Sequence, residues 1–309
     1  MMRATSLALL ALPSATIAFS IATPRLSAPT RGGWARMGAP PTGAPASPEE
    51  AAYLAQLQVH ELPQGFRVGV TGFEFSPVEL QDSTAVMNLT LIALDTPTDD
   101  WAAVFTRNRF PGAPIKVGRQ RLAAGGPLQA VVVNNKISNV CSAGDGVADS
   151  EAVCAQVAEA LSLPGGGEAV LPMSTGVIGW RLPVEHMSAA LPAAVAALTT
   201  GSALPAARSI MTTDRFPKLR SVSACGGRLV GFAKGAGMIE PNMATMLAFV
   251  LTDVPMPRDA LQPMLRRAAD ASFNSASVDA DQSTSDTLLC LSSGVCHCRE
   301  GMSDERRHG

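Results

Sequence analysis

Five short runs of apolar residues, each bounded by turn-forming residues, constrain the fold of this chain more than any other feature. Apolar runs of about 4–8 residues between turn signals are typical of buried strands, whereas helices need about 10 residues or more. The runs occupy residues 129–135, 168–175, 228–235, 245–253 and 286–294. The sequence therefore predicts a core of buried strands, beginning beyond about residue 64.

Three longer segments predict helices between these strands. Residues 149–163 place apolar side chains four apart on one face, at Val153, Val157 and Leu161. We expect Asp149 or Ser150 to cap the start of this helix. Pro164 and the glycines at 165–167 should end it, and that Gly triplet lacks the Lys-Ser/Thr of a phosphate-binding loop.

The other two predicted helices cover residues 184–199 and 257–273. Pro192 lies inside the first and is expected to kink or split it. The second should turn three apolar side chains inward, at Leu261, Leu265 and Ala268. Strands that alternate with helices in this way predict a mixed α/β (α+β) domain.

Composition excludes several classes of protein. The 309 residues carry a formal net charge of −2 with Lys and Arg scattered, so there is no basic footprint for nucleic acid. No apolar segment reaches the roughly 20 residues that a membrane span requires. The 6 cysteines match no disulfide framework, which favours a reducing compartment. The group Cys290, Cys296, His297 and Cys298 fits no common zinc module, so we expect no metal site.

The N-terminal segment differs from the rest of the chain. Residues 1–48 contain no acidic residue and supply positive charge at Arg3, Arg25, Arg31 and Arg36. With its short apolar stretch, the segment is interpreted as an organelle-targeting leader that resembles bipartite plastid leaders; a mitochondrial presequence is the alternative. Residues 49–63 are expected to be a linker. A secreted protein is disfavoured, because the glycosylation-like triplet at Asn88 lies within a predicted buried strand, residues 83–95.

One stretch, KGAGMIEPNMATMLAFVLTD (234–253), indicates chemistry as well as structure. A threonine at the first position of its apolar run, Thr245, supplies a hydroxyl. The chain has only 4 histidines and no Gly-x-Ser-x-Gly motif, so a Ser-His-Asp arrangement is poorly supplied. A hydroxyl nucleophile here would need another base.

Cleavage of the Ala244–Thr245 peptide would provide that base. Thr245 would then carry a free α-amine, which titrates at about 7.7–8.0 and is partly neutral at physiological pH. Thr activated by an N-terminal amine is an established type of nucleophile. The competing interpretation is that Thr245 only begins a strand and that Lys234 is a solvated loop charge.

A series of motifs in order along the chain resembles the ornithine acetyltransferase family of bifunctional arginine-biosynthesis enzymes. The resemblance covers residues 64–294. The motifs are FTRNRFPGAP (105–114), VVVNNKISNVCSAGDG (131–146), STGVIGWRLP (174–183), IMTTDRFPK (210–218), the stretch around Thr245 and SFNSASVDADQSTSDT (272–287).

The resemblance implies an activity and a set of residue roles. Thr245 matches the nucleophile, which is freed when the precursor divides into an α chain (64–244) and a β chain (245–309). Thr175 and Gly176 match the oxyanion hole, and Thr212 and Lys234 match substrate-binding positions. The implied reaction moves acetyl from N-acetylornithine to glutamate through an acetyl-Thr245 ester, with acetyl-CoA as a second donor in bifunctional members. The resemblance also implies no cofactor, an aminopeptidase-related fold, and heterotetramers of two α and two β chains.

The sequence departs from this family near its end. The final VCHCREGMSDERRHG resembles nothing in the family, whose members continue well beyond this point with further substrate-binding residues. We therefore expect a C-terminally truncated β chain, atypical after about residue 294. Ala280 also replaces a glycine and should alter a turn slightly. Two alternatives stay open: a hydrolase of the related aminopeptidase group, and an inactive remnant.

Overall fold

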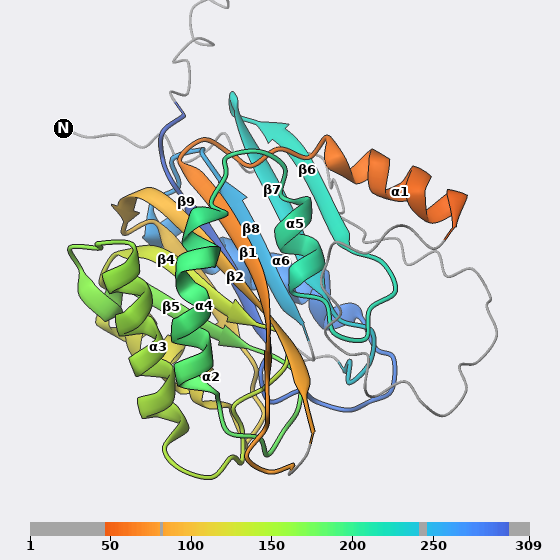
Figure 1. Cartoon of the computed structure of the whole chain (residues 1–309). Helices are drawn as coiled ribbons and strands as arrows, with labels where there is room; N and C mark the ends of the chain where they lie inside the picture. The colour runs from red at the N-terminus through yellow and green to blue at the C-terminus, as the bar shows by residue number, and fades with distance from the viewer. Residues whose placement is uncertain (1–46, 81–82, 241–245, 297–309) are drawn as a thin grey trace, which may run out of the picture.

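The protein is described by a computed structural model covering residues 47–80, 83–240 and 246–296. Its strands form two mixed sheets (Figure 1). The first sheet has the order β1-β2-β4-β5, in which β4 and β5 are parallel and the other pairs are antiparallel. Its strands are β1 (Phe66–Phe75), β2 (Ala85–Thr98), β4 (Leu128–Asn134) and β5 (Val170–Ser174).

The second sheet has the order β3-β9-β8-β7-β6, with β8 and β9 parallel and the other pairs antiparallel. Its strands are β3 (Trp101–Phe105), β6 (Lys218–Ala224), β7 (Gly227–Lys234), β8 (Leu247–Thr252) and β9 (Thr287–Ser292). All five strands predicted from the apolar runs are confirmed. The glycosylation-like triplet at Asn88 lies in β2, with the Asn88 side chain buried, as expected.

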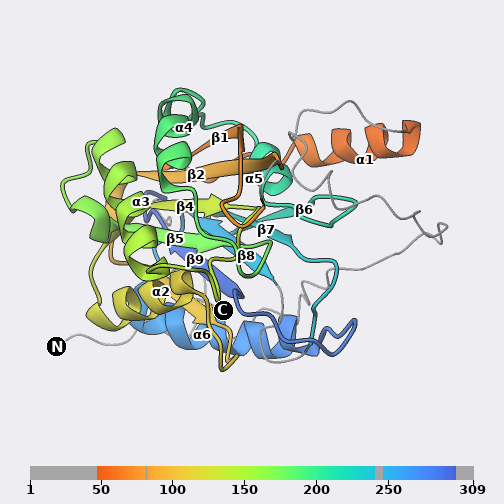
Figure 2. The same cartoon turned by 60° about the horizontal axis from the view of Figure 1, so that its bottom comes forward.

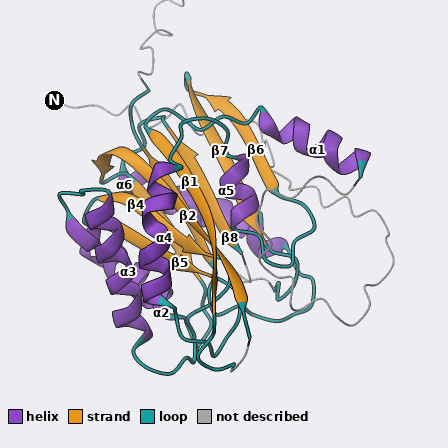
Figure 3. Cartoon of the chain, in the orientation of Figure 1, coloured by secondary structure: helices purple, strands orange, loops and turns teal. Residues whose placement is uncertain are grey.

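Helices flank the two sheets (Figure 3). They are α1 (Pro48–Gln58), α2 (Ala113–Ala124), α3 (Gly146–Ala160), α4 (Val184–Ala196), α5 (Leu204–Ser209) and α6 (Arg258–Ala271). Short 3₁₀ helices cover Gly166–Ala169 and Phe273–Ser275. Within the described residues, none of the helices combines the length and apolar character needed to cross a membrane.

Three apolar clusters organise these elements into layers. The largest lies between the sheets and includes Val131 and Leu171 from the first sheet and Phe232 and Phe249 from the second. The last two rings stack at a centroid distance of 4.8 Å. A second cluster joins the outer face of the first sheet to α3 and α4, and a third joins the second sheet to α6. Figure 2 shows α4 and α6 on opposite sides of the paired sheets. The predicted mixed α/β class is confirmed.

The structure corrects the predicted start of α3. The helix begins at Gly146, and Asp145 is its cap: the Asp145 carboxylate accepts hydrogen bonds from the N–H groups of Val147 and Ala148 at 3.0 and 3.1 Å. The expectation that Asp149 or Ser150 caps this helix is wrong. An Asp that accepts from the second and third amides satisfies donors that a helix start otherwise leaves unpaired.

Two further helix predictions need correction. In α6 the buried alanine is Ala269 and not Ala268, because Ala269 continues the four-residue spacing of Leu261 and Leu265. In α4 the helix is not split at Pro192. Pro192 is exposed, so its ring lies on the solvent side of the helix and not in the core.

The segment predicted as a linker (49–63) contains most of α1. Ser47 caps the helix by accepting the Glu50 N–H at 3.2 Å, and proline occupies the first helical position. Leu54 and Leu57 are buried in the core between the sheets. Tyr53 donates a hydrogen bond to the Pro217 carbonyl at 2.9 Å, which attaches α1 close to β6.

Candidate active site

The first predicted site pair follows the end of β5. There β4 and β5 run parallel with Asn134 opposite Ser174, and the Asn134 amide donates to the Ser174 hydroxyl at 2.6 Å. The Asn134 side-chain oxygen also accepts the N–H groups of Lys136 and Ile137, which turns the chain after β4. Thr175 is buried, and its N–H donates to the Asn134 carbonyl at 3.1 Å. The turn after β5 is therefore fixed against the turn after β4.

Gly176 is held in a conformation that requires glycine. Its φ is 127°, and a Cβ there would lie 2.2 Å from the Lys136 carbonyl oxygen. The Ser138 hydroxyl donates to the Gly176 carbonyl at 2.6 Å, and the Val177 N–H donates to the Lys136 carbonyl at 2.8 Å. Unlike Thr175, Gly176 is exposed. The fixed turn thus presents the Gly176 backbone at the surface.

Two hydrogen-bond donors at this turn are available to a ligand. The Thr175 N–H is occupied by Asn134, whereas neither the Thr175 hydroxyl nor the Gly176 N–H takes part in a hydrogen bond with the described residues. If this pair stabilises an oxyanion, its two donors are therefore the side chain of Thr175 and the backbone of Gly176. Preorganised donors of this kind need no rearrangement when charge develops.

Asn135 connects the turn after β4 to the loop that carries Thr212. The Asn135 amide donates to the Met211 carbonyl at 2.8 Å. Lys136 is buried, and burial lowers the pKa of its ammonium. Thr212 itself is half-buried, with its N–H directed at the Asp214 carboxylate at 3.4 Å. Hydrogen bonds through the turn after β4 therefore link the Thr175–Gly176 turn to the loop that carries Thr212.

Asp214 links the Thr212 loop to the end of β7. Its Oδ1 accepts from the Lys218 ammonium at 2.5 Å and from the Gly235 N–H at 2.7 Å. Burial alone would raise the pKa of this carboxyl, but the Lys218 charge and these hydrogen bonds outweigh burial and lower it. Lys218 also donates to the Gly235 carbonyl at 2.9 Å. Asp214 is therefore an ionised carboxylate beside the last residue of β7, Lys234.

The Lys234 side chain is buried, with 3% of its surface exposed. It ends β7 and pairs across the sheet with Leu247, the first residue of β8. Burial lowers the pKa of Lys234, while the charges of Asp214 and Asp286 act in the opposite direction. The interpretation of Lys234 as a solvated loop charge is therefore wrong. Burying a lysine side chain costs free energy, and a buried lysine whose pKa is shifted by burial and by nearby charges is a candidate for a functional role.

The predicted nucleophile Thr245 and the preceding Ala244 lie outside the described residues. Met246, which follows Thr245, is described. Its N–H donates to Asp286 Oδ1 at 2.6 Å, and its carbonyl accepts the Thr287 N–H at 3.0 Å. The point at which the chain enters β8 is therefore held against the start of β9. Strand β8 lies next to β7, which ends at Lys234.

The loops before α2 and β9 close this region. The Gly112 N–H donates to the Thr284 carbonyl at 2.9 Å, and the Ala113 N–H donates to the Asn139 carbonyl at 3.0 Å. Asn139 belongs to the same turn as Lys136, and Thr284 lies two residues before Asp286. Hydrogen bonds therefore join the carboxyl ends of β4 and β5 to the amino ends of β8 and β9.

Four charged residues of this region were not identified from the sequence: Asp214, Lys218, Asp286 and Lys136. The first two lie within the IMTTDRFPK motif, four residues apart, and Asp286 directly precedes an apolar run. That spacing was the available signal for the Asp214–Lys218 pair. No pattern in the sequence indicated that Asp286 would contact Met246.

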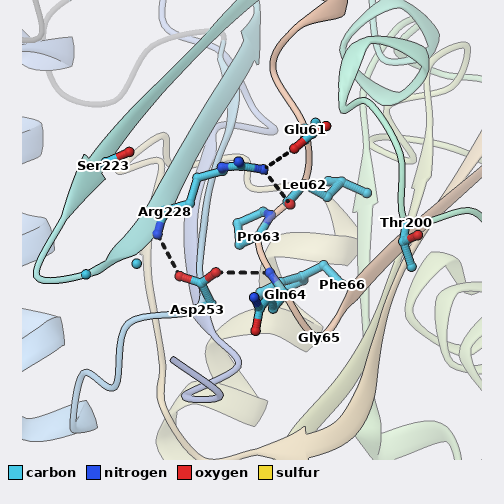
Figure 4. A pocket seen from close by; sticks show the side chains of 12 residues that line it. Glu61, Leu62, Pro63, Gln64, Gly65, Phe66, Thr200, Ser223, Arg228 and Asp253 are labelled. Carbon is cyan, nitrogen blue, oxygen red and sulfur yellow. Dashed lines mark hydrogen bonds and ion pairs between the residues drawn. The ribbon is translucent and has the colours of Figure 1, made fainter. Parts of the chain in front are cut away.

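A cavity of about 540 Å³ lies at the other end of the second sheet (Figure 4). It is bordered by the start of β7 and by Asp253, which follows β8. Asp253 accepts the N–H groups of Arg228 and Gln64 at 2.7 and 3.1 Å, and the Arg228 guanidinium pairs with Glu61 at 2.9 Å. None of the predicted site residues lines this cavity.

The cysteine group near the C-terminus is only partly described. Cys290 is buried in β9, where burial raises the pKa of its thiol to about 12. Cys296 is half-buried, and His297 and Cys298 lie outside the described residues. A thiol with so high a pKa is a poor metal ligand, because the thiolate is the form that binds metals.

Comparisons with known proteins identify the family. The model of the ArgJ family matches residues 76–307. A mitochondrial arginine biosynthesis bifunctional protein ArgJ from Uncinocarpus reesii is 41% identical over 248 residues, which cover 75% of this chain and 53% of that protein. The ArgJ protein of Geobacter sulfurreducens is 42% identical over 234 residues, covering 74% of this chain and 58% of that protein.

Among solved structures, the ornithine acetyltransferase of Mycobacterium tuberculosis in complex with ornithine is 29% identical, with a TM-score of 0.46. The match covers 62% of this chain and 98% of that chain. This chain spans little more than half the length of the two curated relatives. Because the family model matches well over half of its residues, this chain belongs to the ArgJ family.

Proposed function

We propose that this protein transfers an acetyl group from N2-acetyl-L-ornithine to L-glutamate, releasing L-ornithine and N-acetyl-L-glutamate. The observation that carries the proposal is Lys234, buried at the end of β7 and paired with the first residue of β8. Substrates of this class carry an α-carboxylate, for which a desolvated ammonium is a suitable point-charge partner. Family membership and the relatives' names support the same reaction.

The nucleophile would be produced by the chain itself. The Thr245 hydroxyl attacks the Ala244 carbonyl, the peptide C–N bond breaks, and an ester with a free Thr245 amine results. Water then hydrolyses the ester, leaving Ala244 with a carboxylate and Thr245 with both a hydroxyl and an amine. The amine is close to the ideal pKa for a general base at physiological pH. This cleavage would separate an α chain from a β chain.

Acetyl transfer then takes two steps. The Thr245 hydroxyl passes its proton to its own amine and attacks the acetyl carbonyl. When the tetrahedral intermediate collapses, the Thr245 amine returns that proton to the departing nitrogen, so ornithine leaves as a free amine and an acetyl ester stays on Thr245. The glutamate amine attacks this ester in turn and regenerates Thr245.

The described residues would stabilise these steps. The Thr175 hydroxyl and the Gly176 N–H would donate to the oxyanion, and losing one such donor costs about 3–4 kcal/mol of transition-state stabilisation. Thr212 would contact the substrate from the loop that Asp214 holds against the end of β7. Acetyl-CoA as a second acetyl donor, and assembly of two α and two β chains into a heterotetramer, belong to the same proposal.

Mass spectrometry of the purified chain tests the processing step. Wild-type protein should divide between residues 244 and 245, Thr245→Ala should stay intact, and Thr245→Ser should still divide because it keeps a hydroxyl. Product analysis with N-acetylornithine, with and without glutamate, tests the reaction. N-acetylglutamate should form only when glutamate is present, whereas acetate release without glutamate would indicate a hydrolase. An intact wild-type chain without either product would support the inactive remnant.

The leader, residues 1–48, supports delivery to an organelle, and we propose a plastid in preference to a mitochondrion. The absence of acidic residues and the presence of arginines favour an organelle address. A relative whose name places it in mitochondria supports an organelle as well. A fluorescent protein fused to the leader should localise to plastids, and localisation to mitochondria would overturn the plastid assignment.

A further inference from the structure

Helix α1 supports the loop that carries Thr212. This Thr212 loop, residues 210–217, joins α5 to β6, and α1 lies on the β6 side of the molecule (Figures 1 and 2). Tyr53 of α1 donates a hydrogen bond to the Pro217 carbonyl at 2.9 Å. Its ring also meets the Phe216 ring edge to face, with the ring centroids 5.8 Å apart. The last two residues of the loop therefore rest against a single side chain of α1.

Tyr53 is held in place by the rest of its helix. Leu54 and Leu57, which follow it on α1, are buried in the core between the sheets, and Tyr53 packs against the same apolar cluster. Ser47 caps the first turn of the helix by accepting the Glu50 N–H at 3.2 Å. A side chain whose position is fixed by packing of this kind can hold a neighbouring loop within a narrow range of geometries.

The end of the loop that Tyr53 holds is connected by hydrogen bonds to Thr212. Lys218 directly follows Pro217, and its ammonium donates to the Asp214 carboxylate at 2.5 Å and to the Gly235 carbonyl at 2.9 Å. Asp214 in turn accepts the N–H groups of Gly235 and Thr212 at 2.7 and 3.4 Å. A displacement of the chain at Pro217 would therefore move Lys218 and, through Asp214, the backbone at Thr212.

Helix α1 lies outside the part of the chain that the family model matches. That model matches residues 76–307, whereas α1 covers Pro48–Gln58. The motifs that resemble the family also begin after α1. Neither the motifs nor the family match therefore assigns a role to this helix, and the contacts of Tyr53 alone point to one.

We propose that Tyr53 is a positioning residue of the acetyl-transfer site, which holds the Thr212 loop in the conformation that binds substrate. The proposal rests on the proposed function, because it assumes that Thr212 contacts the substrate. Fixing the backbone of each loop residue costs conformational entropy. A loop that is ordered before the substrate arrives therefore binds it more tightly than a loop that must become ordered on binding.

Tyr53→Phe keeps the ring of Tyr53 but removes its hydrogen bond to Pro217. The net contribution of one neutral hydrogen bond corresponds to about a fivefold change in an equilibrium constant. We expect KM for N-acetylornithine to rise about two- to fivefold while kcat stays within about twofold, because a substrate contact of Thr212 acts in the ground state and the transition state alike. A purely structural role would instead lower the fraction of folded enzyme, which reduces kcat and leaves KM unchanged.

Ser221→Ala is the matched control. His60 Nδ1 and Ser221 Oγ share a hydrogen bond of 2.7 Å, which joins the segment after α1 to β6. This bond therefore also attaches the N-terminal part of the described chain to β6, but it does not involve the Thr212 loop. Ser221→Ala should keep the wild-type KM and kcat.

Limited proteolysis provides a measurement that needs no substrate. Arg215 is exposed within the Thr212 loop and offers trypsin a cleavage site. Cleavage follows the population of the opened loop when the loop closes faster than it is cut. Tyr53→Phe should therefore be cut between residues 215 and 216 about two to five times faster than wild type, and Ser221→Ala at the wild-type rate. Mass spectrometry of the fragments identifies the cut.

The outcomes separate this inference from the function on which it rests. If wild type makes no N-acetylglutamate, the proposed function fails, and the trypsin comparison alone then decides whether Tyr53 holds the loop. If wild type is active, an unchanged KM or an unchanged cleavage rate in Tyr53→Phe overturns the role of Tyr53, as does an equal rise of KM in Ser221→Ala. Should Tyr53→Phe fail to fold, Phe216→Leu replaces it: losing the ring contact from the loop side should raise KM, and a wild-type KM would contradict the proposal.

Discussion

Gly176 packs so closely against Lys136 that a Cβ at position 176 would lie 2.2 Å from the Lys136 carbonyl oxygen. The same carbonyl accepts the Val177 N–H at 2.8 Å, so it cannot withdraw without losing a hydrogen bond. The close approach of these two backbones is what holds Thr175 and Gly176 after the end of β5.

Gly176→Ala should therefore destabilise the protein strongly. The methyl group meets backbone atoms that cannot rotate away, and the φ of 127° is unfavourable for alanine, so we expect a loss of about 2–4 kcal/mol. Gly179→Ala is the matched control: φ there is 93°, but nothing lies within 4 Å of an added Cβ. It should cost only about 1–2 kcal/mol. Urea unfolding of both variants measures the difference, and equal losses would contradict the close contact.

Asp214→Asn should lower stability and change its dependence on pH. The pKa of the carboxyl is lowered in the folded protein, so its contribution to stability is complete above the pKa of the unfolded chain, about 3.9, and is lost as pH falls through the folded value. We expect the variant to lose about 1–3 kcal/mol at pH 7, because Lys218 loses its partner. The free energy of unfolding should then depend less on pH below about 4.

The control for this variant is Asp95→Asn. Asp95 pairs with Arg67 at 2.9 Å, but both side chains are well exposed. Such surface pairs contribute at most about 1 kcal/mol. Unfolding curves between pH 3 and 7 would contradict the assignment if the two variants lost stability equally, or if Asp214→Asn kept the full pH dependence of wild type.

Ala280→Gly should stabilise the protein. Ala280 has a φ of 61°, in the left-handed region where a Cβ is unfavourable. The backbone at Ala280 thus has the geometry of a glycine position, and removing the methyl group should gain about 1 kcal/mol. Ala276 provides the control in the same loop, since its φ of −94° suits alanine and glycine there should lose up to about 1 kcal/mol. Thermal unfolding that ranked the two variants in the reverse order would be incompatible with the turn geometry.

Thiol labelling should separate exposed from buried cysteines. Cys141 and Cys225 are exposed, whereas Cys154 and Cys290 are buried with thiol pKa values raised to about 12. At pH 8 on the order of one molecule in ten thousand carries either buried thiolate. In peptide mapping after treatment with a thiol reagent, the exposed pair should react in the native protein and the buried pair only in denaturant. Rapid native labelling of Cys290 would show that β9 is not in the core.

Four of the five strands that were predicted, β4, β5, β8 and β9, are buried along all or nearly all of their length. Runs such as 129–135 and 286–294 stand out because four consecutive apolar residues form the centre of each, and both became central strands. Strand β6 was not predicted: it is an edge strand whose sequence, KLRSVSA, alternates irregularly, and only one of its residues is buried. The sequence of an edge strand responds to only one neighbour and to water, so its pattern is weak.

For the site, the sequence by itself determined which residue types stand at Thr175, Gly176, Thr212, Lys234 and Thr245, and its motifs indicated their roles. Tertiary structure alone decided that Lys234 is buried within the electrostatic reach of Asp214 and Asp286, and that Asp286 holds the amide of Met246. These carboxylates stand 20 residues before and 52 residues after Lys234 in the chain. Only the pairing of β7, β8 and β9 brings them together, since hydrogen bonds and charge act over a few ångströms in space regardless of separation along the sequence.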